Sequence, residues 1–188
     1  MPFFTTIKKQ LTLSISLVAM GIFVIVSCEK DDLAEPKPFT PQVTSASFIE
    51  EFDTVGNLAQ KGWEIINKSA PYGAMAWRQG KYELGGKYGN DIVGFPAYSA
   101  VYNQNEFASV DLNCGSGQST ISCWLITKVI PVKNGDEISF YTRTHGDFPD
   151  RLQVRANFST GSTEVGKSAT DVGDFTQLLL DINPGLVL

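Results

Sequence analysis

Asp147 and Asp150 are two carboxylates whose type and spacing could support catalysis. They lie in the segment Gly-Asp-Phe-Pro-Asp-Arg, and two carboxyl groups can hydrolyse a glycosidic bond as acid and base. The competing interpretation is a solvated turn with surface ion pairs to Arg143 and Arg151. His145 is the single histidine, and no G-x-S-x-G motif accompanies it. We therefore expect no catalytic site, with a glycan hydrolase as the alternative.

A second acidic pair, Glu50 and Asp53, suggests a structural calcium site. In a straight strand Glu50 shares a face with Phe48 and Phe52, and a carboxylate buried between phenylalanines needs a metal, an arginine or hydrogen-bond donors. Calcium takes six to eight oxygen ligands, and these two residues supply only part of such a set. An arginine partner, or a bulge that turns Glu50 outward, remains the alternative.

Aromatic side chains gather in a loop-rich stretch together with amides and an acid. Aromatic faces stack on the apolar faces of sugars, and amides or carboxylates bond their hydroxyl groups. The alternative is that these rings fill the core of a sandwich. The candidate ligand-binding residues are Trp77, Tyr88, Tyr98 and Tyr102, with Asn90, Asp91, Asn103 and Asn105 nearby.

Residues 1–27 are typical of a secretory signal peptide. Lys8 and Lys9 precede an apolar run from Leu11 to Val26 that is short for a membrane span. The run ends in Ile25-Val26-Ser27-Cys28, which resembles a bacterial lipobox with Ile in place of the usual Leu. That resemblance implies that Cys28 is acylated and anchors the protein to a membrane, since acyl chains give a lasting attachment without a spanning helix.

Residues 28–45 are expected to form an acylated tether. Glu29-Lys30-Asp31-Asp32 resembles the acidic export signal that sends some lipoproteins to the outer face of the outer membrane, and a merely solvated tether is the alternative. Pro36, Pro38 and Pro41 favour an extended spacer.

The two remaining cysteines, Cys114 and Cys123, are expected to form a disulfide. Such pairs oxidise outside the cytoplasm, and closing the loop from Gly115 to Ser122 would stabilise the fold by about 2–3 kcal/mol on the loop-entropy model. A zinc pair lacking its other two ligands and free thiols are the alternatives.

The charge of the chain excludes some partners. Removal of residues 1–27 takes away only Lys8 and Lys9, which leaves 15 − 2 = 13 basic against 20 acidic residues and a net charge of −7. Nucleic acid and anionic headgroups need a basic surface, so neither is an expected partner.

Residues 46–188 read as one all-β domain. Leu152, Val154, Ala156 and Phe158 alternate with polar residues, and Ile138 and Phe140 follow an Asn-Gly turn that predicts a hairpin with the apolar run CWLITKVIPV. We expect that run to lie deep in a sheet. Phe175, Leu178, Leu179 and Ile182 are spaced for a short helix after Asp174, although three consecutive leucines also suit a strand.

Several ordered blocks resemble one family. FIEEFDTVGNLAQKGWEIIN resembles the opening of the cleaved-adhesin, or choice-of-anchor J, domain, with its strand from Phe48 to Asp53 and its Gly62-Trp63. WLITKVIPVKNGDEISFYTRT is similar to the next two strands, with Lys128 where the family usually has proline, and the blocks continue to the Asn-Pro segment near residue 184.

The resemblance implies a lectin-like jelly-roll β-sandwich that is generally not catalytic. Family members continue into further strands after the Asn-Pro segment, so we expect residues 46–188 to be a C-terminally incomplete sandwich. The chain is thus predicted to be a lipid-anchored surface module that binds glycan or protein. The alternatives are a glycan hydrolase and a structural accessory subunit.

Overall fold

The computed structural model describes residues 9–10, 47–82, 95–144 and 149–187. These residues belong to two compact units. The described part of the larger unit lies within Phe48–Ile130 and Tyr141–Leu188, and that of the smaller unit is 9–10, 47 and Pro131–Phe140.

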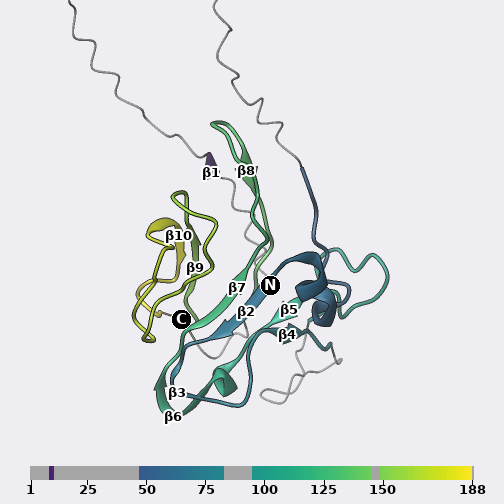
Figure 1. The fold of residues 1–188 in the computed structure, drawn as a ribbon. Helices are drawn as coiled ribbons and strands as arrows, with labels where there is room; N and C mark the ends of the chain where they lie inside the picture. The colour runs from purple at the N-terminus through teal and green to yellow at the C-terminus, as the bar shows by residue number, and fades with distance from the viewer. Residues whose placement is uncertain (1–8, 11–46, 83–94, 145–148, 188) are drawn as a thin grey trace, which may run out of the picture. The chain divides into compact units, whose positions relative to one another are not determined.

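A long antiparallel ribbon forms the centre of the larger unit (Figure 1). One side of the ribbon is formed by β2 (Glu64–Asn67), β3 (Ala70–Tyr72) and β4 (Arg78–Gln79). The other side is formed by β5 (Ala108–Ser109), β6 (Gly115–Thr120) and β7 (Cys123–Ile126). Strand β2 pairs with β7, β3 with β6 and β4 with β5. The register continues from Glu64 opposite Ile126 to Ala70 opposite Thr120, then shifts before Tyr72 meets Gly115.

A short 3-10 helix, η1 (Val55–Lys61), leads into β2 and supplies two buried core residues, Val55 and Leu58. The helix ends at Gly62, whose φ of 85° lies in the left-handed region that glycine adopts without strain. Val55, Leu58 and Trp63 are buried together. The Phe52 ring meets the edge of Trp63 at 5.6 Å and 73°, a favourable arrangement of two aromatic rings.

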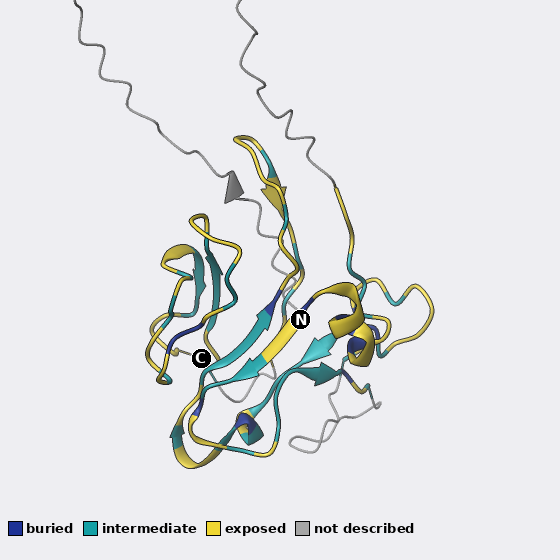
Figure 2. Cartoon of the chain, viewed as in Figure 1, coloured by how far each residue is buried: buried dark blue, intermediate teal, exposed yellow. Residues whose placement is uncertain are grey.

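The remaining buried surface is small. In the part of the chain that the structure describes, seven apolar residues are buried, and the larger strands are mostly half-buried (Figure 2). Each buried contact therefore carries a large share of the stability.

Strand β9 (Leu152–Ala156) pairs antiparallel with β10 (Gln177–Ile182). The strand expected at residues 152–158 is thus confirmed over 152–156. The helix expected after Asp174 is wrong, because the leucines pair with β9 and the register shifts between Leu178 and Leu180. A helix this short gains little from its own hydrogen bonds, whereas a neighbouring strand satisfies the backbone directly.

Two further expectations are corrected. Phe48–Asp53 is not a strand, and Phe52 has a φ of 57°, which interrupts the alternation needed to place three side chains on one face. The apolar run after Cys123 is a strand only as far as Ile126, and Val129 is exposed.

In the smaller unit, β1 (Lys9–Gln10) pairs antiparallel with β8 (Glu137–Ile138). The turn before β8 is confirmed by the bond from the Asp136 N–H to the Lys133 carbonyl at 3.1 Å. The predicted hairpin is not formed, because the partner of β7 is β2.

A second short 3-10 helix, η2 (Leu112–Cys114), lies in the larger unit. With this helix all the elements are named, and the described chain is mostly strand with little helix.

An ion pair across β9 and β10 predicts acid sensitivity. The Arg151 guanidinium bonds the Asp181 carboxylate at 2.8 and 2.5 Å and holds the pKa of Asp181 below its usual value. A carboxyl with a depressed folded-state pKa contributes stability above its unfolded pKa of about 3.9, and that stability is lost as the pH falls through the folded pKa. We expect the free energy of unfolding, measured with denaturant, to fall less in Asp181→Asn than in wild type when the pH is lowered from 6 through the folded-state pKa of Asp181.

The matched control is Asp174→Asn, since Asp174 has no ion pair within the described residues. It should follow the wild-type pH dependence. An Asp181→Asn curve parallel to wild type would contradict the assignment.

Candidate functional site

The residues Ala97–Gln104, here called the tyrosine loop, form a closed turn on the larger unit. The Ala97 N–H donates to the Gln104 carbonyl at 2.8 Å, so the intervening residues project from a fixed base. Ala97 itself is buried. The loop carries two of the four predicted ligand-binding residues, Tyr98 and Tyr102.

A buried carboxylate holds the loop in shape. Glu106 is only 3% exposed, and its Oε1 accepts the backbone N–H groups of Tyr102 and Asn103, both at 2.6 Å. Hydrogen bonds from N–H groups to a carboxylate are stronger than bonds between neutral groups. At the other side of the loop the Ser99 hydroxyl donates to Glu51 at 2.6 Å.

Tyr98 stacks on Tyr141, a residue that lies more than forty positions later in the chain. The ring centroids are 3.3 Å apart and the planes differ by 14°, while the residues are 53% and 48% exposed. The hydrogen bond with Tyr141 raises the pKa of Tyr98. The pair therefore presents aromatic surface and hydroxyl groups to solvent.

Tyr102 extends this surface. It is 81% exposed, and Asn103 and Gln104 beside it are also exposed. An exposed aromatic face next to amide groups has the chemistry that sugar rings require, namely stacking plus hydrogen bonds to hydroxyls.

The other two predicted ligand-binding residues are not placed on this loop. Trp77 is half-buried, and its Nε1 donates to the Cys123 carbonyl at 3.0 Å. It lines a groove with Trp63 and the start of η1. Tyr88 lies outside the described residues.

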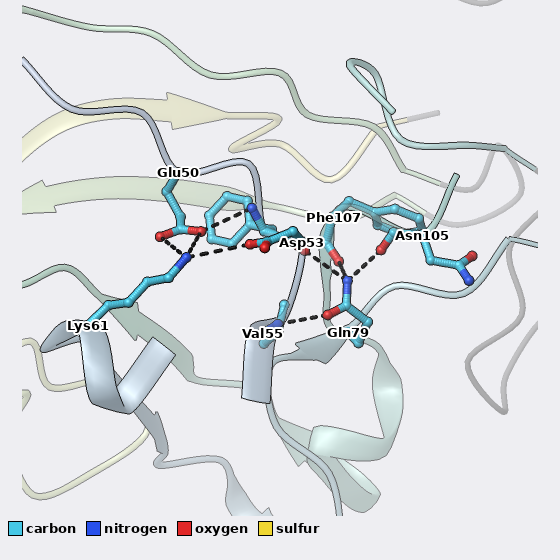
Figure 3. Close-up of polar contacts among 8 residues, drawn as sticks. Glu50, Asp53, Val55, Lys61, Gln79, Asn105 and Phe107 are labelled. Carbon is cyan, nitrogen blue, oxygen red and sulfur yellow. Dashed lines mark hydrogen bonds and ion pairs between the residues drawn. The ribbon is translucent and has the colours of Figure 1, made fainter. Parts of the chain in front are cut away.

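Glu50 and Asp53, the predicted calcium ligands, both face the ammonium of Lys61 (Figure 3). The Lys61 Nζ lies 2.8 and 3.0 Å from the two Glu50 oxygens and 3.5 Å from Asp53, and these contacts, above all the bond with Glu50, raise the pKa of Lys61. Within the described ranges no three His, Cys, Asp or Glu side chains form a metal-binding group. The Lys61 ammonium therefore occupies the position between the two carboxylates, and the calcium site stays a prediction.

Lys61 gives a direct test of that prediction. Because its ammonium already lies against both Glu50 and Asp53, where a cation would have to bind, we expect neither calcium nor a chelator to change the melting temperature of the wild-type protein. Lys61→Met removes this charge and leaves two carboxylates unpaired. A calcium-dependent rise in the wild-type melting temperature, as expected when a ligand binds only the folded state, would contradict the lysine-filled arrangement.

Gln79 connects the turn before η1 to β5 (Figure 3). Its Oε1 accepts the Val55 N–H at 2.7 Å. Its Nε2 faces three backbone carbonyls, those of Phe52 at 2.9 Å, Asn105 at 2.5 Å and Phe107 at 3.5 Å. The orientation of the amide is thus fixed by one donor on one side and three acceptors on the other.

Cys114 and Cys123 lie side by side as free thiols joined by a hydrogen bond. That bond, and then burial, raises the pKa of Cys114, whereas the same bond lowers the pKa of Cys123. The disulfide itself stays a prediction.

Of the candidate catalytic pair, the structure describes only Asp150. Its carboxylate accepts the Thr144 hydroxyl at 2.6 Å, and its carbonyl accepts the Asn183 amide at 3.2 Å. Both bonds are typical of a structural turn. Asp147, His145 and the predicted lipidation residue Cys28 lie outside the described residues.

Three residues that shape the tyrosine loop were not singled out in the sequence. Tyr141 could have been found as an aromatic residue beside the loop only with knowledge of the fold. Glu106 has a local signal, an acid directly after Asn103-Gln104-Asn105, since acids that close polar turns bond backbone N–H groups. Glu51 has no such signal.

No described helix is long and apolar enough to cross a membrane. Comparison with family models, with curated proteins and with solved structures produced no match to this chain.

Proposed function

We propose that this chain is a non-catalytic, lipid-anchored binding module at the cell surface, built on a jelly-roll β-sandwich and taking glycan or protein as its ligand. The lipobox-like segment at Cys28 and the acidic residues after it support the anchor and the outer-membrane location. The mostly strand-based fold is compatible with a sandwich.

The observation that carries the proposal is the tyrosine loop. Tyr98 and Tyr102 lie beside polar amides on a turn fixed by a buried carboxylate, and Tyr141 stacks on Tyr98 from a later part of the chain; all three side chains have substantial exposure. Exposed apolar surface gathered in one patch often marks a binding site, and a fixed backbone lowers the entropy cost of binding. A glycan fits this surface best, because it uses both the ring faces and the amides.

Tyr102→Ala is expected to abolish binding to the saccharides that the wild-type protein captures on a glycan array, because the substitution removes the most exposed stacking face. The melting temperature should stay close to wild type, since an exposed side chain contributes little to stability.

Tyr72→Ala is the matched control, because Tyr72 is a tyrosine of similar exposure on β3, outside the tyrosine loop. It should bind as wild type does. Equal loss in both variants, or no saccharide captured by the wild type, would contradict a glycan site on the loop, and capture of a defined surface protein lost in Tyr102→Ala would identify the protein alternative.

A further inference from the structure

Strands β2 and β4 lie on the same side of the two-stranded ribbon in the larger unit. Residues of both strands line one groove. The groove has a volume of about 640 Å³. One wall is Trp63, Glu64 and Ile65, the other is Trp77, Arg78 and Gln79, and the start of η1 closes it. We call this feature the inner groove.

Each strand beside the inner groove is paired on one side only. Strand β2 pairs with β7 and β4 pairs with β5, and within the described residues neither pairs with a further strand. The unpaired edge of a strand carries N–H and C=O groups that can bind another strand.

The alternation of a strand identifies the backbone groups at these edges. The Lys68 N–H donates to the Ser122 carbonyl. Because the backbone groups of a strand alternate in direction, those of Ile66 and Glu64 also point to β7, whereas the backbone N–H and C=O of Ile65 point away from it. In the same way the Gly80 N–H donates to the Phe107 carbonyl. The backbone groups of Arg78 therefore point to β5, and those of Gln79 point away from it. Ile65 and Gln79 both line the inner groove.

We propose that the inner groove takes an extended peptide strand of a partner protein, bound through the backbones of Ile65 and Gln79 on its two sides. This site is separate from the tyrosine loop and does not depend on the function proposed for it. An extended peptide fits because it alone presents N–H and C=O groups along both edges at once. Trp77 and Ile65 supply apolar surface for alternate side chains.

The charge of the groove specifies the partner further. The Arg78 guanidinium is already bonded to Asp111 at 2.5 Å, whereas Glu64 is exposed and has no ion pair among the described residues. The unpaired charge is therefore negative, and the bound strand should carry a lysine or arginine opposite Glu64.

The test uses a short capped peptide of alternating valine and threonine with one central lysine, observed by amide hydrogen exchange. On binding, the Ile65 and Gln79 amides should become protected, while those of Ile66 and Arg78, already paired, should change little. A version with N-methyl groups on alternate amides keeps the side chains but loses the N–H donors that face one of the two edges, and it should bind about tenfold more weakly or worse.

Glu64→Lys is the matched variant, because Glu64 is exposed and its replacement should leave the fold intact. It should weaken the lysine peptide about fivefold and favour the same peptide with a central glutamate. Four results would each overturn the proposal: no binding of the lysine peptide, equal binding of its N-methyl version, protection elsewhere in the chain, or self-association of the protein that protects the same amides and thus identifies a second copy as the occupant.

Discussion

Gln79→Glu is expected to destabilise the protein by about 3 kcal/mol. The wild-type amide places its NH₂ group against the carbonyls of Phe52, Asn105 and Phe107. A carboxylate at that position would put negative charge against three carbonyl oxygens, with the Val55 N–H as its one remaining donor. The loss should be measured as the change in free energy of unfolding in urea at neutral pH.

The matched control for Gln79→Glu is the same chemical change at Gln177, which is exposed on β10. Gln177→Glu should change the free energy of unfolding by less than about 0.5 kcal/mol. Similar effects at the two positions would show that the carbonyls around Gln79 are not what fixes the amide.

Leu58→Ala should cost about 2–5 kcal/mol, the range measured when a buried leucine leaves a cavity. Leu58 is 1% exposed and packs with Val55 and Trp63 in the main cluster of the larger unit. A domain of this kind has a total stability of about 5–15 kcal/mol, so the variant is expected to be partly unfolded at moderate temperature. The measurement is the urea midpoint and the free energy of unfolding.

Leu112→Ala provides the comparison, since Leu112 is 64% exposed on η2. Its effect should be small. If Leu58→Ala unfolds no more easily than Leu112→Ala, the cluster around η1 is not the core of the unit.

Local signals predicted part of the fold. The strand at residues 152–156 and the Asn-Gly turn before β8 are present because both depend on neighbouring residues, although all five residues of β9 are half-buried and do not alternate between a buried and an exposed face. The leucines at 178–180 became a strand because β9, about twenty residues earlier in the chain, offers backbone partners, and periodicity over so few residues cannot reveal a partner. The left-handed conformation of Phe52 had no local signal either.

The sequence likewise predicted only part of the candidate site. The sequence singled out Tyr98 and Tyr102 as candidate ligand-binding aromatic residues in a polar loop, with packing in the core as the alternative, and the structure exposes both on one turn. Tyr141 and Glu106 act through contacts that only folding creates. A charge partner was expected for Glu50 because a straight strand would bury it, and although that strand is not formed, Glu50 is paired with Lys61, which lies on η1 eight residues after Asp53.

The most direct test of the account is an NMR titration with a saccharide captured on the array, because one experiment reports both the place of binding and the state of the sugar. We expect the shifted protein signals to be those of Tyr98, Tyr102, Tyr141 and their neighbours in the tyrosine loop, with the saccharide signals unchanged in number over time. Shifts centred elsewhere, or new saccharide signals from a cleaved glycosidic bond, would contradict a non-catalytic binding site on this loop.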